Sequence, residues 1–274
     1  MRKMFAVVAV MVAGLVSLSA LGQEQSAQSA LDRGDLDGAR AILSTQAVQG
    51  QAGDVVVAAL VGEAQIALAE RRLDHVGVLL VQIGEKLSDV NSIEHGRRSG
   101  WFVVLAYLRA ELAQIEGRSG DAKSAIREAL SLIQSGAKVH LGWLGSVEYL
   151  AASIFRDENV YARRHAEAAV SAFAQTKRPY ERGYALMRLG DLEWDRGKLR
   201  RAYIEYDNAL RAFRDADSRR SIVLAHLHVA DRLIVSGEVE AARARFSIAQ
   251  REYAAAGSPT ELAFRLREIE EKLK

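Results

Sequence analysis

Apolar and polar residues follow a helical spacing along most of this chain, and the segments that show it come in pairs. The last segment illustrates the spacing, because Leu262, Leu266, Ile269 and Leu273 share one side of a helix that is charged elsewhere. Four pairs are predicted in the second half, at residues 100–116 and 121–134, 141–156 and 161–175, 180–196 and 199–214, and 221–236 and 239–255. Less regular pairs are predicted upstream, at residues 25–33 and 38–48, and at 54–72 and 75–87. Polar residues 88–99 are expected to form a linker or a distorted unit.

Small residues recur within these pairs at a fixed interval of 40 positions. Two alanine series show it, Ala122, Ala162, Ala202 and Ala242, and then Ala129, Ala169, Ala209 and Ala249. A turn-type residue precedes each member of the first series, at Gly117, Asp157, Gly197 and Gly237. Self-similarity on this scale indicates a repeat architecture, in which each unit buries its apolar face only against its neighbours. Such arrays usually bind other proteins, so the pattern favours binding over catalysis.

The first 22 residues have the layout of a secretory signal peptide. Arg2 and Lys3 are followed by an uncharged apolar run, and small residues then precede the polar segment that begins at Gln23. We therefore expect cleavage before Gln23 and a periplasmic or secreted protein without stable membrane insertion. The alternative is an N-terminal membrane anchor, because residues 4–21 are uncharged and just long enough to span a bilayer.

Charge and composition narrow the classes of function. The 274 residues include 37 basic and 35 acidic side chains, and removal of Arg2 and Lys3 with the signal leaves 35 of each. A neutral mature chain argues against binding to nucleic acid or anionic membranes, because both require an excess of Lys and Arg. The chain has no cysteine, which excludes thiol catalysis and thiolate metal sites.

No local motif for catalysis, a cofactor or a metal is present. Signatures for nucleotide binding, a nucleophile elbow and a zinc protease are missing, and no two of the six histidines stand four residues apart. The carboxylates lie among arginines at helix-surface spacing, for which surface ion pairs are the ordinary explanation. We therefore expect a protein without catalytic residues, cofactor or metal, although an active site assembled from distant residues would leave no local trace.

The unit around Gly190 carries a specific family resemblance. The motif requires a large residue, Leu-Gly, a turn glycine, Ala, an aromatic residue and Ala-Leu. These positions are occupied by Leu186, Leu189-Gly190, Gly197, Ala202, Tyr206 and Ala209-Leu210. The unit thus resembles the tetratricopeptide repeat family, in which small residues let the two helices of a hairpin approach closely. Because 40 residues exceed that family's period of about 34, we expect longer helices or loops here.

The resemblance implies an all-α fold, a right-handed superhelix of antiparallel helix hairpins. The predicted organisation is a signal peptide at residues 1–22, a repeat array at 23–256 and a C-terminal capping helix at 257–274.

In this family the first helix of each hairpin lines a concave groove that binds extended peptides or partner helices. The groove positions carried over to this sequence are Tyr107, Glu111, Tyr184, Met187, Asp191, Trp194, Asp195 and Asp231, with Leu224, Leu227 and Ile234 beside them. Trp, Tyr and Met dominate many protein contacts, although burial between units would equally explain the apolar members. Met187 and Asp191 replace the Lys and Asn that grip a C-terminal carboxylate in relatives, so an apolar or basic segment is the more natural ligand.

The sequence therefore predicts an exported, non-catalytic scaffold or adaptor that binds a protein or peptide partner. Two alternatives stay open. One is a structural subunit that assembles into homo-oligomers, and the other is an envelope enzyme or glycan-binding protein built on a helical solenoid.

Overall fold

The computed structural model describes residues 38, 41–42, 45, 53–89, 93 and 95–274. Within them lie eleven bounded helices and no strand, which confirms the predicted all-α fold of helix hairpins. The predicted signal peptide and most of the first predicted hairpin lie outside the described residues. Of the helices that are described, none combines the length and the apolar character needed to cross a membrane. The chain divides into two compact units, Met1–Phe155 and Arg156–Lys274.

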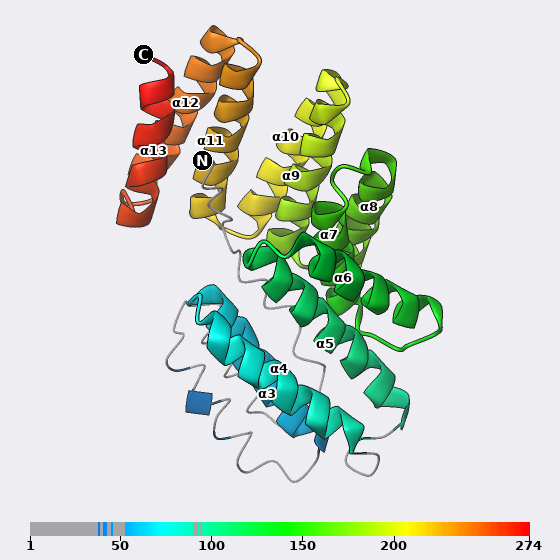
Figure 1. Cartoon of the computed structure of the whole chain (residues 1–274). Helices are drawn as coiled ribbons and strands as arrows, with labels where there is room; N and C mark the ends of the chain where they lie inside the picture. The colour runs from blue at the N-terminus through cyan, green and yellow to red at the C-terminus, as the bar shows by residue number, and fades with distance from the viewer. Residues whose placement is uncertain (1–37, 39–40, 43–44, 46–52, 90–92, 94) are drawn as a thin grey trace. The chain divides into compact units, whose positions relative to one another are not determined.

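The described part of the first unit contains two hairpins and one further helix (Figure 1). Its helices are α3 (Gly53–Ala69), α4 (Leu73–Ser88), α5 (His95–Ile115), α6 (Ser119–Gln134) and α7 (Leu141–Ile154). Helix α3 packs on α4 and α5 on α6, while α5 also contacts α3 and α7. Because α5 begins at His95, the connection after α4 is shorter than the predicted polar linker.

The second unit consists of six helices (Figure 1). They are α8 (Asn159–Gln175), α9 (Pro179–Asp195), α10 (Leu199–Asp215), α11 (Arg219–Val235), α12 (Val239–Ala255) and α13 (Thr260–Lys272). Helices α9 and α10 form one hairpin and α11 and α12 the next, with α8 packed on α9 and α13 against α11 and α12.

Equal helix lengths explain the 40-residue period of the sequence. Each helix from α8 to α12 has 17 residues, and turns of three residues join them, so a new helix begins every 20 residues. Two such steps make one repeat. The residues in excess of the shorter tetratricopeptide period therefore lie in the helices and not in the loops.

The turns share one backbone geometry that ends each helix. The middle residue of each turn has a positive φ, at Lys177, Gly197, Asp217 and Gly237. The N–H of Lys198, one residue after Gly197, donates to the carbonyl oxygen of Glu193 at 2.9 Å, which is the Schellman arrangement. Glycine adopts this φ freely, whereas Lys177 and Asp217 each cost about 1 kcal/mol there.

The recurring alanines pack where the sequence places them, between helices. All eight members of the two series are at most 2 % exposed. Gly190 of α9 shows how close the approach is, because a Cβ atom there would lie 2.5 Å from the ring of Tyr206 on α10. Tyr206 is fully buried. The prediction that small residues permit tight contacts within this hairpin is therefore confirmed.

Candidate functional site

The candidate site of the second unit is formed by side chains on α9, α11 and α13. We call this set the first-helix surface, comprising Tyr184, Met187, Asp191, Asp195, Leu224, His228, Asp231, Arg232, Arg265 and Lys272. These helices occupy equivalent places in successive repeats, so their side chains meet across neighbouring hairpins. The spacing of the contacts is close to one repeat. Asp191 pairs with His228 at 2.6 Å, Asp195 with Arg232 at 2.9 Å, and each pair is 37 residues apart.

Asp191 is the centre of the polar contacts on this surface, although it is only 7 % exposed. Its Oδ1 accepts a hydrogen bond from the Tyr206 hydroxyl at 2.8 Å and lies 2.6 Å from Nε2 of His228. A guanidinium nitrogen of Arg232 lies 3.1 Å from the same oxygen. Burial by itself would raise the pKa of Asp191, but His228, Arg232 and Arg188 together hold that pKa well below its ordinary value. Asp191 is therefore a charged group that ties three helices together.

The other two predicted carboxylates of this unit also have cationic partners within the protein. Asp195 lies 2.7 Å from Arg156 and 2.9 Å from Arg232. Asp231 lies 2.7 Å from Lys272 and 3.1 Å from Arg265, both on α13. Burial opposes ionisation of Asp231, but these two cations lower its pKa nonetheless. The surface therefore presents mostly compensated negative charge, which removes the main reason to expect a basic ligand.

The apolar residues of the candidate site divide into core and surface. Trp194 is 9 % exposed and packs edge-on against Tyr203, with ring centroids 5.7 Å apart, so it belongs to the hydrophobic core. Tyr184, Met187 and Leu224 are half-buried and pack with one side against the core. Their remaining faces are accessible to solvent.

Tyr107 and Glu111 lie on α5 of the first unit. Tyr107 is 3 % exposed and packs edge-on against Trp143 of α7, with ring centroids 5.6 Å apart. Burial raises the pKa of Glu111 to about 7, and a hydrogen bond with the Tyr107 hydroxyl only partly offsets that effect. Burial and the neighbouring Glu111 raise the pKa of Tyr107 as well. Glu111 is thus a carboxyl group that exchanges its proton near neutral pH.

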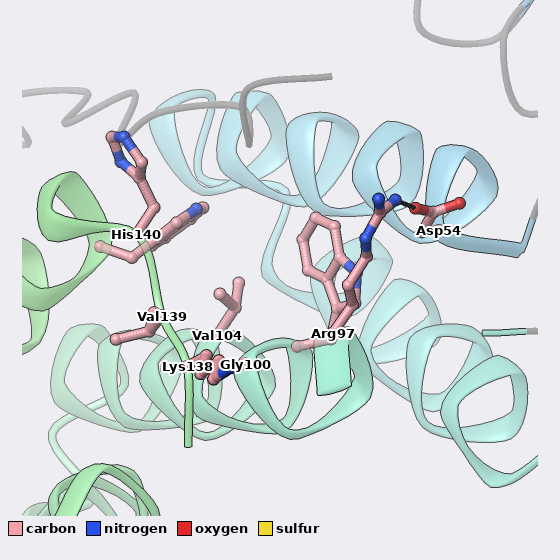
Figure 2. A pocket seen from close by; sticks show the side chains of 9 residues that line it. Asp54, Arg97, Gly100, Val104, Lys138, Val139 and His140 are labelled. Carbon is pink, nitrogen blue, oxygen red and sulfur yellow. Dashed lines mark hydrogen bonds and ion pairs between the residues drawn. The ribbon is translucent and has the colours of Figure 1, made fainter. Parts of the chain in front are cut away.

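A small pocket in the first unit lies between α3, α5 and the segment that leads into α7 (Figure 2). Arg97 closes one side through an ion pair with Asp54 at 2.7 Å. Gly100 lets α5 approach the chain at Lys138, because a Cβ atom at that position would collide with the Lys138 carbonyl. The pocket measures about 90 Å³, room for about three water molecules. That volume is below the range of about 300–1,000 Å³ that is usual for small-molecule sites.

The sequence did not identify the cations of the first-helix surface, although a signal for them exists. Arg232 and His228 follow their carboxylate partners by 37 residues, and Arg156 precedes Asp195 by 39. Oppositely charged residues separated by slightly less than one repeat would have predicted these pairs. Arg163 of α8 similarly pairs with Glu193 at 2.6 Å, a carboxylate that is 2 % exposed. In the part of the chain that the structure describes, no cluster of three or more His, Cys, Asp or Glu residues could hold a metal.

Comparison with known proteins identifies the class of fold. No protein-family model matches the chain, and no curated protein sequence matches it. Among solved structures, BtubC (BKLC) from P. vanneervenii aligns with a TM-score of 0.60 at 15% identity, over 87% of this chain and 94% of that one. Aspartyl phosphate phosphatase F from Bacillus subtilis aligns with a TM-score of 0.51 at 15% identity, over 94% of this chain and 79% of that one.

A third structure of similar fold is that of a Rap protein complexed with Competence and Sporulation Factor. It aligns with a TM-score of 0.50 at 12% identity, over 85% of this chain and 76% of that one. Similarities at these identities concern the fold alone. They agree with the hairpin architecture, and the chain is a helical-repeat protein with a tetratricopeptide-like fold.

Proposed function

We propose that this chain is a non-catalytic binding protein of the cell envelope, which holds a peptide or a helix of another protein on the first-helix surface. The observation that carries the proposal is the half-buried apolar group of Tyr184, Met187 and Leu224 beside a network of ion pairs. Apolar side chains with one face in the core and one toward solvent are suited to protein contacts, and Tyr and Met are frequent there.

The ion pairs support this role because they hold the surface in one arrangement. Asp191 and Asp195 each bind side chains of α11, and Asp231 binds two side chains of α13. Successive repeats are thereby fixed against one another through their first helices. A surface that is already ordered loses less conformational entropy when a ligand binds.

The same pairing favours a mainly apolar ligand. Asp191, Asp195 and Asp231 are each paired with an Arg or Lys side chain, so little free charge is left to attract a basic segment. An apolar side chain from the partner would instead contact Met187 and Leu224.

Two further observations support the proposal. A protein of similar fold has been solved in complex with Competence and Sporulation Factor, so this type of fold accommodates a bound factor. The signal-peptide pattern at residues 1–22 favours export, and the mature chain would then act in the periplasm or outside the cell.

Photo-crosslinking in the native envelope tests the proposal. A benzophenone amino acid is introduced at Leu224, with the matched control at Ile204 of α10, which is 50% exposed but lies outside the first-helix surface. We expect one defined adduct from position 224 and none from position 204. Met187→Glu should then reduce the yield of that adduct about tenfold, since it places a charge in the apolar contact, whereas Ile204→Glu should not.

Other outcomes would identify the alternatives. Equal adducts from both positions contradict a specific surface, and adducts between two copies of the chain indicate self-assembly. An enzyme would be indicated by an activity that is lost in Glu111→Gln, because burial raises the pKa of Glu111 to about 7, within the range that suits a general acid or base. Trp194 and Asp191 are unsuitable for this test, because both are buried and their replacement would alter folding.

A further inference from the structure

A second pocket in the same unit lies between α10, α11 and α12, outside the first-helix surface. Its cavity of about 330 Å³ is lined by Asp207, Arg211 and Arg214 of α10, His226 of α11 and Arg245 of α12, together with two aliphatic side chains. Three guanidinium groups thus face one carboxylate. Such an excess of positive charge around a concave site attracts anions.

The arginines of this pocket are incompletely paired. Arg245 lies 3.6 Å from Asp207, which is a loose ion pair. Within the described part of the chain, the side chains of Arg211 and Arg214 have no hydrogen-bond or ion-pair partner. Their donors are therefore available to a ligand. Guanidinium groups bind the oxygens of phosphate through paired N–H donors, whereas a carboxylate offers only two oxygens to three such groups.

His226 supplies the second, independent sign of a ligand. The residue is 3 % exposed, and neither of its ring nitrogens has a hydrogen-bond partner. A neutral imidazole has one donor and one acceptor, and a buried polar group without a partner is unfavourable. Burial and the charges of Arg245 and Arg214 lower the pKa of His226 to about 4, with Asp207 opposing them only weakly. The ring is therefore neutral at pH 7 and holds one unsatisfied N–H beside three cations.

We propose that this pocket binds a phosphate group, either as the free ion or as the phosphate of a small molecule. The oxygens would accept hydrogen bonds from Arg211, Arg214 and Arg245, and one would accept the N–H of His226 after a small shift of the side chains around it. One water molecule occupies about 30 Å³, so a pocket of about 330 Å³ is several times larger than a phosphate ion. Leu210 and Ile248 give the remaining space an apolar wall, which suits the carried group of a phosphate monoester.

Calorimetric titration of the purified chain with inorganic phosphate and with phenyl phosphate tests the site at constant ionic strength. We expect saturable binding, with sodium acetate bound at least about tenfold more weakly. Binding of inorganic phosphate alone assigns the free ion, whereas tighter binding of phenyl phosphate assigns a carried phosphate, and either supports the proposal. Saturation by acetate at the same concentration, or no saturation by either phosphate probe, overturns it.

A matched pair of variants distinguishes binding in the pocket from a general effect of net charge. Arg214→Gln should weaken phosphate binding about tenfold, because it removes a charged hydrogen bond. Arg200→Gln removes the same charge from an exposed position on the same helix that does not line the pocket, and should leave the affinity unchanged. Equal losses in the two variants would contradict the proposal.

The histidine provides a readout that requires no substitution in the core. The groups that face His226 are Arg214 and Asp207 of α10 and Arg245 of α12, with Arg211 lining the same pocket. A bound phosphate adds negative charge beside them, so the pKa of His226 should rise upon binding. NMR titration of the ring signals with and without phosphate measures that rise. An unchanged His226 titration in the presence of saturating phosphate would place the ion elsewhere and refute the assignment.

Discussion

Replacement of Gly190 by alanine tests the central packing argument, because two opposite effects compete at this position. Within a helix, alanine is favoured over glycine by about 1 kcal/mol. The added Cβ would, however, lie 2.5 Å from the ring of Tyr206, about an ångström closer than ordinary contact. Tyr206 is fully buried and cannot move aside without disturbing its neighbours.

The size of the effect on stability follows from the packing of Tyr206 and from its hydrogen bond. Overpacking of a buried site costs about 1–3 kcal/mol. Displacement of the ring also strains the hydrogen bond from its hydroxyl to the charged Asp191, and bonds of that type contribute about 1.5–3 kcal/mol. After the gain in helix propensity, we expect Gly190→Ala to lower the free energy of unfolding by about 2 kcal/mol.

Urea denaturation followed by circular dichroism measures this change, and Gly77→Ala is the matched control. Gly77 is also a helical glycine, on α4, but no atom lies within 4 Å of the Cβ that alanine would add. The control should therefore be stabilised by about 0.5–1 kcal/mol. If Gly190→Ala were as stable as Gly77→Ala, close approach of α9 and α10 would not be the reason for glycine, and the packing argument would fail.

Three further predictions concern charge and turns. Asp191→Asn should lower the free energy of unfolding by about 2 kcal/mol at pH 7. Because the pKa of Asp191 is depressed in the folded protein, this difference should shrink as the pH falls below about 4. Denaturation at pH 7, 4 and 3 measures the change. Glu111 has a raised folded pKa, so its ionisation destabilises the protein as the pH rises from about 4 towards 7. Glu111→Gln should flatten that dependence, and denaturant midpoints at pH 5 and pH 8 that differ as much as in the unmodified chain would contradict this. Gly237→Ala should cost about 1 kcal/mol in thermal unfolding because of its positive φ, whereas Lys177→Gly should be neutral or stabilising, and the reverse order would refute the turn geometry.

The helices and their packing could be predicted because they depend on local spacing. The alanine series defined which residues lie between helices, and Val239–Ala255 agrees with the predicted range to the residue. The start of α5 was less predictable, because polar residues near His95 gave no apolar periodicity, yet the helix continues through them. Pattern reasoning identifies a helix by its buried face, and a terminal turn without such a face gives little signal.

The candidate site was harder to predict, because its properties depend on pairs of residues in different repeats. Asp191 and Asp195 lie on a first helix, as the sequence predicts, but the sequence alone does not show that His228, Arg232 and Arg156 pair with them. Trp194 was expected at a groove and is part of the core. The charge pairing arises from neighbours about 37–39 residues away, which composition and local motifs do not reveal. The cluster of arginines around His226 could not be predicted from local motifs either, because its three members come from two other helices.

The uniform step of 20 residues from α8 to α12 has a consequence for how this protein tolerates rearrangement. Excision or duplication of one complete hairpin, such as residues 179–218, returns every later helix to the same orientation and the same type of neighbour. Loss of a single helix with its turn would instead place every later first helix in the position of a second helix, and every later second helix in the position of a first. Engineered versions of different length should therefore fold when they differ by whole pairs, and aggregate when they differ by an odd helix.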